Sequence, residues 1–251
     1  ENASAAMRRL SVTPQSLHEQ VAFLAAEGFT GMTFSDLAEA FRTGRALPPR
    51  PVVLTFDDGY SDFARNAWPI LCRYDFPATV FVTSGWVADV GAVAAGPALG
   101  DMLTCAQIRE LAASGIEIGA HSHSHPELDQ LPAATLHGEL AVSRVLLEEC
   151  IGGPVRALAY PFGYSTPRVR AAARPAGYRW AAAVRNVRAN SADDLFMLPR
   201  LTIGRSTSRS VFATIMAGAD REVFRRDRML TAGWASVRGV RRAGNRVLGH
   251  A

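Results

Sequence analysis

The stretch from Val52 to Gly59, VVLTFDDG, decides the fold class. Its first five residues are β-branched or apolar, as in a buried strand, and two carboxylates follow where that strand ends. Two later runs have the same form, because residues 116–120 lead into His121 and residues 155–160 lead into Pro161. In parallel α/β folds the carboxyl ends of the strands share one rim, where active sites form. We therefore expect one site built from three strand ends.

Strand-like and helix-like segments alternate along the whole chain. The predicted strands are 52–56, 78–83, 116–120, 155–160, 179–184 and 196–203, and the predicted helices are 17–27, 35–42, 64–74, 104–113, 132–150, 166–174 and 208–217. This spacing is typical of parallel βαβ units. We expect an α/β fold, namely a distorted (β/α) barrel that need not be complete, with an open doubly wound sheet as the alternative. No GxGxxG follows the first strand, so a dinucleotide-binding fold has little support.

Composition and charge fit a globular domain. The 251 residues are 48% hydrophobic and 20% charged, and no apolar run approaches the roughly 18 residues that a membrane span needs. No signal peptide is visible, although the sequence starts at Glu1 rather than at a methionine. All 27 basic residues are arginine, and 11 of them lie from Arg200 onward, so the net charge of +4 is a property of the C-terminal part. This unevenness argues against a nucleic-acid partner.

The charge pattern also suggests a boundary. We expect a barrel domain over residues 1–219 and a basic, arginine-rich tail over residues 220–251, in which Trp234, Val240 and Val247 form a weak apolar stripe. The tail is expected to be a solvated helix packed on the barrel, and peripheral contact with a membrane surface or an anionic polymer is the alternative. The location of the protein, which we expect to be bacterial, stays open between the cytoplasm and the cell envelope.

The three cysteines, Cys72, Cys105 and Cys150, are odd in number, widely spaced and free of any CxxC pattern. This spacing predicts neither a disulfide framework nor a cysteine metal site. We expect all three to be buried as small apolar residues.

The polar residues at the strand ends are those of a metal site. Asp57 and Asp58 repel each other at a buried strand end and need a cation or a proton, although Asp-Asp-Gly is also common in solvated turns. His121 and His125 are four residues apart and can direct two imidazoles at one ion, the alternative being a polar loop of hydrogen-bonded histidines. Together with Asp58 they form a two-histidine, one-carboxylate set, the composition of a hydrolytic metal site.

Three motifs carry a resemblance to a known family. The motifs are TFDDG at residues 55–59, HSHSHP at residues 121–126 and YPFG at residues 160–163. In order and spacing this set resembles the NodB-homology polysaccharide deacetylases, carbohydrate esterase family 4, and the resemblance extends from about Thr13 to Gly218. It implies a distorted (β/α) barrel that removes N-acetyl groups from amino sugars in a polysaccharide or glycoconjugate and releases acetate.

The resemblance also implies roles for individual residues. Asp57 would be the general base, and Asp58, His121 and His125 would hold a divalent ion, Zn²⁺ foremost, with Co²⁺ or Ni²⁺ as alternatives. The backbone N–H of Phe162 would help to stabilise the oxyanion. His123 falls on a variable position of its motif, so it is not expected to be a ligand.

Two departures from the family pattern concern the groups around the base. Ala159 stands where many members carry an arginine that pairs with the catalytic aspartate, and no histidine lies between His137 and His250 to supply the family's late Leu-x-x-His motif. The segment Leu198-Pro199-Arg200 instead resembles the branch with exopolysaccharide and poly-N-acetylglucosamine deacetylases. We predict that Arg200 contacts Asp57 directly and keeps it ionised, the alternative being an ordinary structural ion pair.

Substrate contacts are predicted from aromatic residues near the rim. Tyr60, Tyr160 and Trp180 are the predicted sugar-stacking residues, and Trp86 lies in an irregular segment that could shape a groove. Packing in the core is the alternative use of each ring. Two other functions stay open: an amidase or deformylase acting on a small or lipid-linked sugar, and a non-catalytic carbohydrate-binding barrel.

Overall fold

A six-stranded parallel sheet forms the centre of the molecule. The structure is a computed structural model that describes residues 9–89, 98, 100–230 and 238. The strands of the sheet follow one another in chain order: β3 (Thr55–Phe56), β4 (Thr79–Val82), β5 (Glu117–Ala120), β6 (Ala157–Ala159), β7 (Trp180–Val184) and β8 (Leu198–Arg200). A separate parallel pair joins β1 (Thr30–Met32) to β2 (Pro51–Val53).

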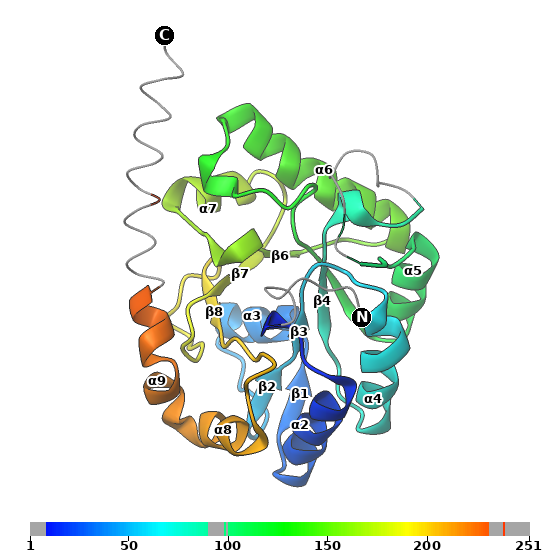
Figure 1. The fold of residues 1–251 in the computed structure, drawn as a ribbon. Coiled ribbons are helices and arrows are strands. Elements are labelled where there is room, and N and C mark those ends of the chain that lie inside the picture. Colours follow the sequence, from blue (N-terminus) through cyan, green and yellow to red (C-terminus); the bar gives the residue numbers. More distant parts are fainter. Residues whose placement is uncertain (1–8, 90–97, 99, 231–237, 239–251) are drawn as a thin grey trace.

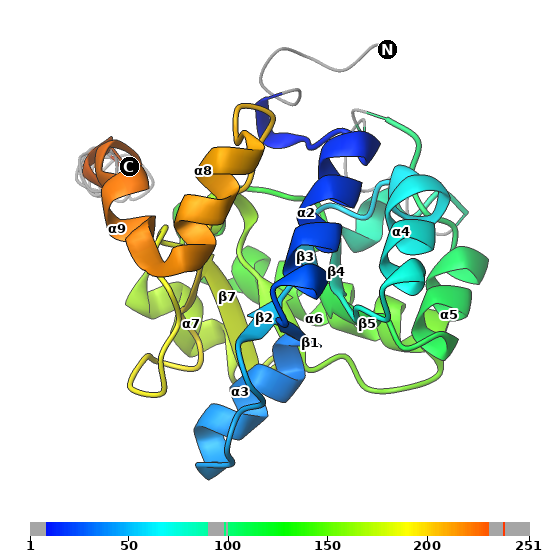
Figure 2. The same ribbon diagram turned by 90° about the horizontal axis from the view of Figure 1, so that it is seen from below.

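The sheet curls until its two edge strands face each other. Arg200 on β8 donates a hydrogen bond from Nη1 to Oγ1 of Thr55 on β3, at 3.0 Å, although the backbones of these strands do not pair. Figure 1 shows the helices arranged around the sheet, and Figure 2 shows that α3 lies at one end of the barrel, beyond the other helices. The predicted incomplete (β/α) barrel is confirmed, and the open doubly wound sheet is excluded because the strand order never reverses.

Helices follow most strands. They are α2 (Pro14–Ala26), α3 (Phe34–Thr43), α4 (Trp68–Arg73), α5 (Cys105–Ala113), α6 (Ala133–Ile151), α7 (Pro167–Ala173), α8 (Arg209–Thr214) and α9 (Asp220–Val223). Those that begin at a threonine or serine cap are α2, α3, α5, α7 and α8. Thr33 and Thr104 each form a capping box, which satisfies amide groups at the start of α3 and α5. Helices α2 and α8 lie side by side (Figure 2). Among the described residues no helix is long and apolar enough to cross a membrane.

Two predicted strands differ from those observed. The run 52–56 divides at Leu54, so that β2 pairs with β1 while β3 pairs with β4. The predicted strand 196–203 shortens to Leu198–Arg200, an edge strand that tolerates Pro199 because it has a neighbour on one side only. Strand β1 was not predicted, since three residues are too short to show a periodic pattern.

The cysteines correct the sequence prediction. Cys105 and Cys150 form a disulfide that joins α5 to α6 across a separation of 45 residues, with their Cα atoms 5.2 Å apart. Cys72 is a free thiol, and it is exposed rather than buried. The spacing of cysteines along the chain could not reveal this pair, because the two helices meet only in the folded protein.

Removing the disulfide is expected to destabilise the fold. A crosslink over a loop of this length constrains the unfolded chain and is worth about 2–4 kcal/mol. The Cys105→Ser, Cys150→Ser double variant should lose about that much free energy of unfolding in a urea titration, and Cys72→Ser serves as the matched control. Equal unfolding midpoints for the wild-type protein with and without a reductant would show that the crosslink does not form.

Residues 220–230 pack against the body of the molecule. Arg188 pairs with Asp220 (Nε to Oδ1, 3.2 Å), Arg228 donates to the carbonyl of Asn186 at 3.4 Å, and Phe224 is buried. The boundary between residues 219 and 220 stays a prediction. Residues 231–237 and 239–251, which include the predicted apolar stripe, lie outside the described residues.

Candidate active site

The predicted ligands meet at the carboxyl rim of the sheet. Asp58 follows β3, while His121 and His125 belong to the loop after β5, and the ligand atoms of all three lie within 4.8 Å of one another. Oδ1 of Asp58 is 3.3 Å from Nε2 of His125 and 3.5 Å from Nε2 of His121. Carboxylate and imidazole donors at this separation suit one divalent ion with open positions for water and substrate.

The orientation of His121 is fixed from behind. Its Nδ1–H donates to the carbonyl of Ala159 on β6 at 2.8 Å, so Nε2 presents its lone pair toward Asp58. Burial lowers the pKa of His121 below its ordinary value, although the charges of Asp57 and Asp58 act in the opposite direction. A neutral imidazole is the form that binds a metal ion. Ala159, which stands at the position without an arginine, therefore contributes its backbone carbonyl, and this carbonyl orients His121.

A helix holds the histidine loop from outside. Glu139 on α6 accepts hydrogen bonds from the amides of His123 and Ser124, at 2.9 and 2.8 Å, and a further one from the Ser124 hydroxyl. Ser143, one turn later, donates to the carbonyl of Ser122 at 2.9 Å. The sequence reading missed this role of α6, because nothing in the pattern of a long helix marks which of its acidic residues bonds to a loop.

Unusual backbone conformations concentrate at this rim. Asp58, Ser122, His125 and Phe162 all have a left-handed backbone, with φ of 74°, 63°, 57° and 60°. Such conformations cost on the order of 1–3 kcal/mol each and persist where the surrounding structure enforces them. Their clustering indicates that the fold is strained here to aim particular side chains. A side chain at Gly163 (φ 77°) would lie 2.6 Å from Cβ of Val184, so this loop also needs a glycine.

Arg200 makes the predicted contact with Asp57. Its Nη1 donates to Oδ1 at 2.6 Å and its Nη2 to Oδ2 at 2.8 Å, a two-point pairing with the guanidinium also lying 5.3 Å from the centroid of Phe81. Burial acts to raise the pKa of Asp57, but the positive charge of Arg200 and its hydrogen bonds to the carboxylate outweigh burial and lower the pKa to about 2. Asp57 is thus ionised across the whole physiological range. Its Oδ2 lies 4.0 Å from Nε2 of His121, next to the ligand cluster.

Loss of the guanidinium is expected to change the pH dependence of any reaction that needs ionised Asp57. In Arg200→Met the burial of Asp57 is no longer opposed by a nearby cation, so its pKa rises and the acidic limb of the kcat/KM profile moves to higher pH. Arg200→Lys should give a smaller shift but lower activity than wild type, because an ammonium cannot reproduce the two-point contact. Arg205→Met, an exposed site, is the control. An unchanged profile in Arg200→Met would separate Arg200 from the ionisation of Asp57.

The same contact has a consequence for stability. A carboxyl group whose pKa falls from 3.8 to about 2 on folding stabilises the fold above about pH 4 and loses that contribution as the pH falls through 2. The Arg200→Met variant should therefore lose relatively more stability at pH 6 than at pH 2, measured by thermal unfolding at both values. An equal loss at the two values would show that the pair contributes nothing through its charge.

An aromatic cluster borders the ligand cluster. The Trp86 ring stacks on His125 with centroids 5.2 Å apart, and the Phe162 ring contacts His125 edge-on with centroids 4.7 Å apart. Phe162 stacks in turn on Tyr164 at 5.6 Å. Phe162 is 55% exposed, and its amide donates no hydrogen bond to any described residue, which leaves both its ring and its N–H available at the rim.

The predicted sugar-stacking role is wrong for two of the three residues, Tyr160 and Trp180. Tyr160 has no exposed surface, and its hydroxyl donates to the carbonyl of Phe196 at 2.9 Å. Trp180 is 2% exposed at the amino end of β7, away from the rim, and its Nε1 donates to Ser35 on α3. Tyr60 lies directly after Gly59 at the rim and is half-buried, so its role in substrate binding stays a prediction.

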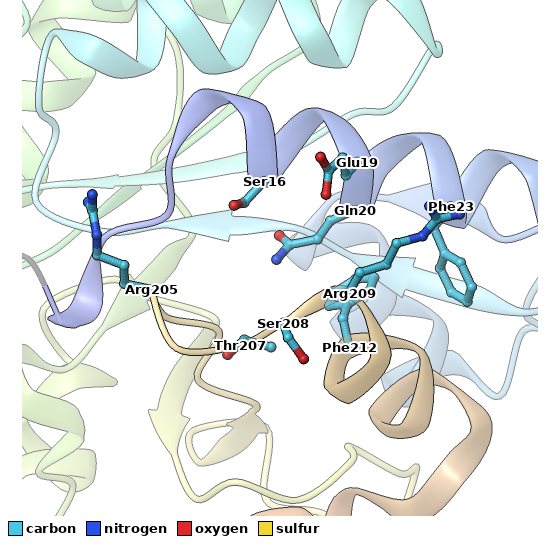
Figure 3. A pocket seen from close by; sticks show the side chains of 9 residues that line it. All are labelled: Ser16, Glu19, Gln20, Phe23, Arg205, Thr207, Ser208, Arg209 and Phe212. Atoms are coloured by element: carbon cyan, nitrogen blue, oxygen red, sulfur yellow. The ribbon is translucent and has the colours of Figure 1, made fainter.

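A separate hollow lies outside the barrel. It has a volume of about 190 Å³ and is lined by α2 and residues 205–212, with Gln20 directed into it (Figure 3). The hydroxyls of Thr207 and Ser208 on its wall already accept hydrogen bonds from the amides of Gly204 and Val211. None of the residues that line this hollow belongs to the candidate active site around Asp57, Asp58, His121 and His125.

The structure is a parallel half-barrel with an Asp-His-His cluster at its carboxyl rim, beside an aspartate paired with arginine. Such a donor set has the composition of metal sites in hydrolytic enzymes. Comparison with known proteins gives the family. The polysaccharide deacetylase family matches residues 44–181, and the chain belongs to that family.

Individual relatives agree with this assignment. The chain is 38% identical over 133 residues to poly-beta-1,6-N-acetyl-D-glucosamine N-deacetylase of Escherichia coli K12, covering 50% of this chain and 20% of that protein. It is 33% identical over 130 residues to chitooligosaccharide deacetylase of Bradyrhizobium sp. ANU 289, covering 51% of this chain and 53% of that one. The chain thus spans between a fifth and about half the length of these two relatives.

A solved structure supports the fold independently. The Streptococcus pyogenes deacetylase PplD, determined in complex with acetate, aligns with a TM-score of 0.75 and 26% identity, over 84% of this chain and 90% of that one. The half-barrel is thus shared over most of the described residues.

Proposed function

We propose that this chain is a divalent-metal-dependent N-deacetylase that acts on N-acetylglucosamine units of a β-1,6-linked polysaccharide. The observation that carries the proposal is the pairing of Asp57 with Arg200 beside the Asp58, His121 and His125 cluster. One carboxylate is held ionised by an arginine and the other faces two imidazoles, so the two acids are suited to different tasks. The names of the Escherichia coli and Bradyrhizobium relatives support N-acetylated amino sugars as the substrate class.

The donor set favours Zn²⁺ as the native ion. Two imidazole nitrogens and one carboxylate oxygen are ligands that zinc accepts in catalytic sites, with further positions left open. A divalent ion held by these three residues would polarise an amide carbonyl and lower the pKa of water. The lowered pKa of His121, which favours the neutral imidazole, and the fixed direction of its Nε2 fit this use.

The protein's own groups supply the remaining chemistry. Arg200 keeps Asp57 ionised and holds its carboxylate in one orientation. Asp57 can therefore take a proton from the attacking water without first changing its side-chain conformation. The N–H of Phe162, which donates to none of the described residues, can donate to the oxyanion that develops on the carbonyl oxygen. The exposed Phe162 ring offers an apolar face to the sugar. The products are acetate and a free amino group on the sugar.

A substrate panel tests the proposal. The purified chain, loaded with Zn²⁺, should release acetate from β-1,6-linked N-acetylglucosamine oligomers at a higher kcat/KM than from chitooligosaccharides of equal length. Release of formate from N-formyl analogues alone, or activity confined to the monosaccharide, would favour an amidase or deformylase acting on small or lipid-linked sugars. Tight oligomer binding without acetate from any glycan would favour a non-catalytic binding barrel.

We also propose that the protein works in an oxidising compartment such as the cell envelope. The Cys105–Cys150 disulfide supports this location, because structural disulfides are rare where thiols are kept reduced. The test is to express the chain with and without export to an oxidising compartment and to count free thiols after denaturation. One thiol per exported chain, from Cys72, is the expected result, whereas three would contradict the proposal.

A further inference from the structure

A buried arginine from the C-terminal part of the chain lies next to the aromatic side of the site. Arg238 has only 3% of its side chain exposed. It pairs with Glu127 (Nη1 to Oε1, 2.9 Å), donates a hydrogen bond to Asp129, and lies with its guanidinium carbon 3.2 Å from the centroid of the Tyr164 ring. An arginine buried this far needs opposite charge around it, and two carboxylates provide it.

The groups that Arg238 contacts are connected to His125 by two routes. Along the chain, Glu127 lies two residues after His125, and Asp129 belongs to the short helical turn Leu128–Gln130 that follows. Through space, Tyr164 stacks on Phe162, whose ring contacts His125 at 4.7 Å. Arg238 therefore bridges the loop after β5, which carries His125, and the loop after β6, which carries Phe162.

Of the two carboxylates that pair with Arg238, Asp129 is the more deeply buried. Asp129 is 2% exposed, and its backbone carbonyl accepts a hydrogen bond from Arg168 on α7 at 3.3 Å. The turn is thus held by Arg168 of α7 through its backbone and by Arg238 through the Asp129 side chain. The Arg238 guanidinium also lies over the face of the Tyr164 ring. This cation–π contact favours one orientation of the ring.

We propose that Arg238 is a positioning residue for substrate binding, which acts through Tyr164 to hold the Phe162 ring as a platform for the sugar. This inference rests on the proposed function, because it assigns the platform to the glycan of that same site. It makes Arg238 a component of the substrate site.

The test uses a pair of substitutions that leaves the net charge of the protein unchanged. Arg238→Met alone leaves Asp129 buried without a partner cation and can destabilise the protein for that reason only. The double variant Arg238→Met, Asp129→Asn removes the positive charge and the buried negative charge together. Arg226→Met, at an exposed arginine of the same C-terminal part, is the matched control. Arg238→Lys keeps the charge but not the fork that serves two carboxylates and a ring.

In the double variant we expect a Tm close to that of the wild type, unchanged zinc content, and a KM for the glycan oligomer raised by about five- to tenfold, with kcat within about twofold. Arg238→Lys should give an intermediate KM, and Arg226→Met none of these changes. A double variant with wild-type stability and an unchanged KM would overturn the proposal. A fall in kcat alone would also overturn it, since that would place Arg238 in the chemistry rather than in binding.

A second measurement does not depend on activity. Amide hydrogen exchange over residues 161–166 should become faster in the double variant and stay as in the wild type in Arg226→Met. If no glycan is deacetylated by the wild-type chain, the proposed function fails while this exchange result still reports whether Arg238 orders the loop. Unchanged exchange in the double variant would overturn the positioning role by itself.

Discussion

Replacing Asp57 with asparagine is expected to lower kcat by about 10²–10⁴-fold while the chain still folds and binds its divalent ion. The amide is nearly isosteric with the carboxylate but cannot accept a proton from water. Asp58, His121 and His125 keep their positions, because the contacts that hold the histidines come from Ala159 and α6 rather than from Asp57. The measurements are acetate release, zinc content by elemental analysis, and Tm.

Asp62→Asn is the control for this result, since Asp62 is an exposed acid five residues later. It should behave like the wild type. A kcat for Asp57→Asn within tenfold of the wild-type value would mean that another group accepts the proton. The ion pair between Arg200 and Asp57 would then have a structural role only.

The second large effect is expected at the ligands. His125→Asn should weaken zinc binding by more than about 100-fold, because loss of even an outer-shell partner of a metal site costs 10–100-fold. Asparagine is chosen over alanine because it tolerates the left-handed backbone at this position, where φ is 57°. Competition with a fluorescent chelator gives the affinity.

His123→Ala is the matched control in the same loop. The His123 side chain bonds to Ser84 through Nδ1 at 2.9 Å and is not part of the ligand cluster. Its zinc affinity should stay near that of the wild type. Full zinc content together with full activity in His125→Asn would remove His125 from the site.

The sequence predicted the parts of the site that depend on strand order. Motifs at the ends of β3, β5 and β6 had to share a rim once the strands were parallel, so Asp58 could be placed near His121 before any coordinates. The contact of Arg200 with Asp57 was predicted because alanine stands at position 159, where many family members carry the arginine that pairs with this aspartate. Arg200, on a late predicted strand, was the candidate to replace that arginine.

Other features depend on which face a residue takes, and this the sequence could not show. Strands of a parallel sheet are buried on both faces, so alternation does not distinguish Tyr160, packed under the helices, from a rim residue. Trp180 was placed near the rim although it lies at the amino end of its strand. The Cys105–Cys150 pair and the bond from Glu139 to the histidine loop join helices to partners that only the tertiary structure brings together.

The central claim is that this rim hydrolyses an N-acetyl group with a divalent ion and Asp57 as base. The most direct test follows acetate and new amino groups released from β-1,6-linked N-acetylglucosamine oligomers by zinc-stripped, zinc-reloaded and Asp57→Asn protein. The account predicts equal amounts of acetate and amine from the reloaded enzyme, and almost none from the other two. Acetate release that survives complete removal of the ion, or that proceeds at the wild-type rate in Asp57→Asn, would contradict it.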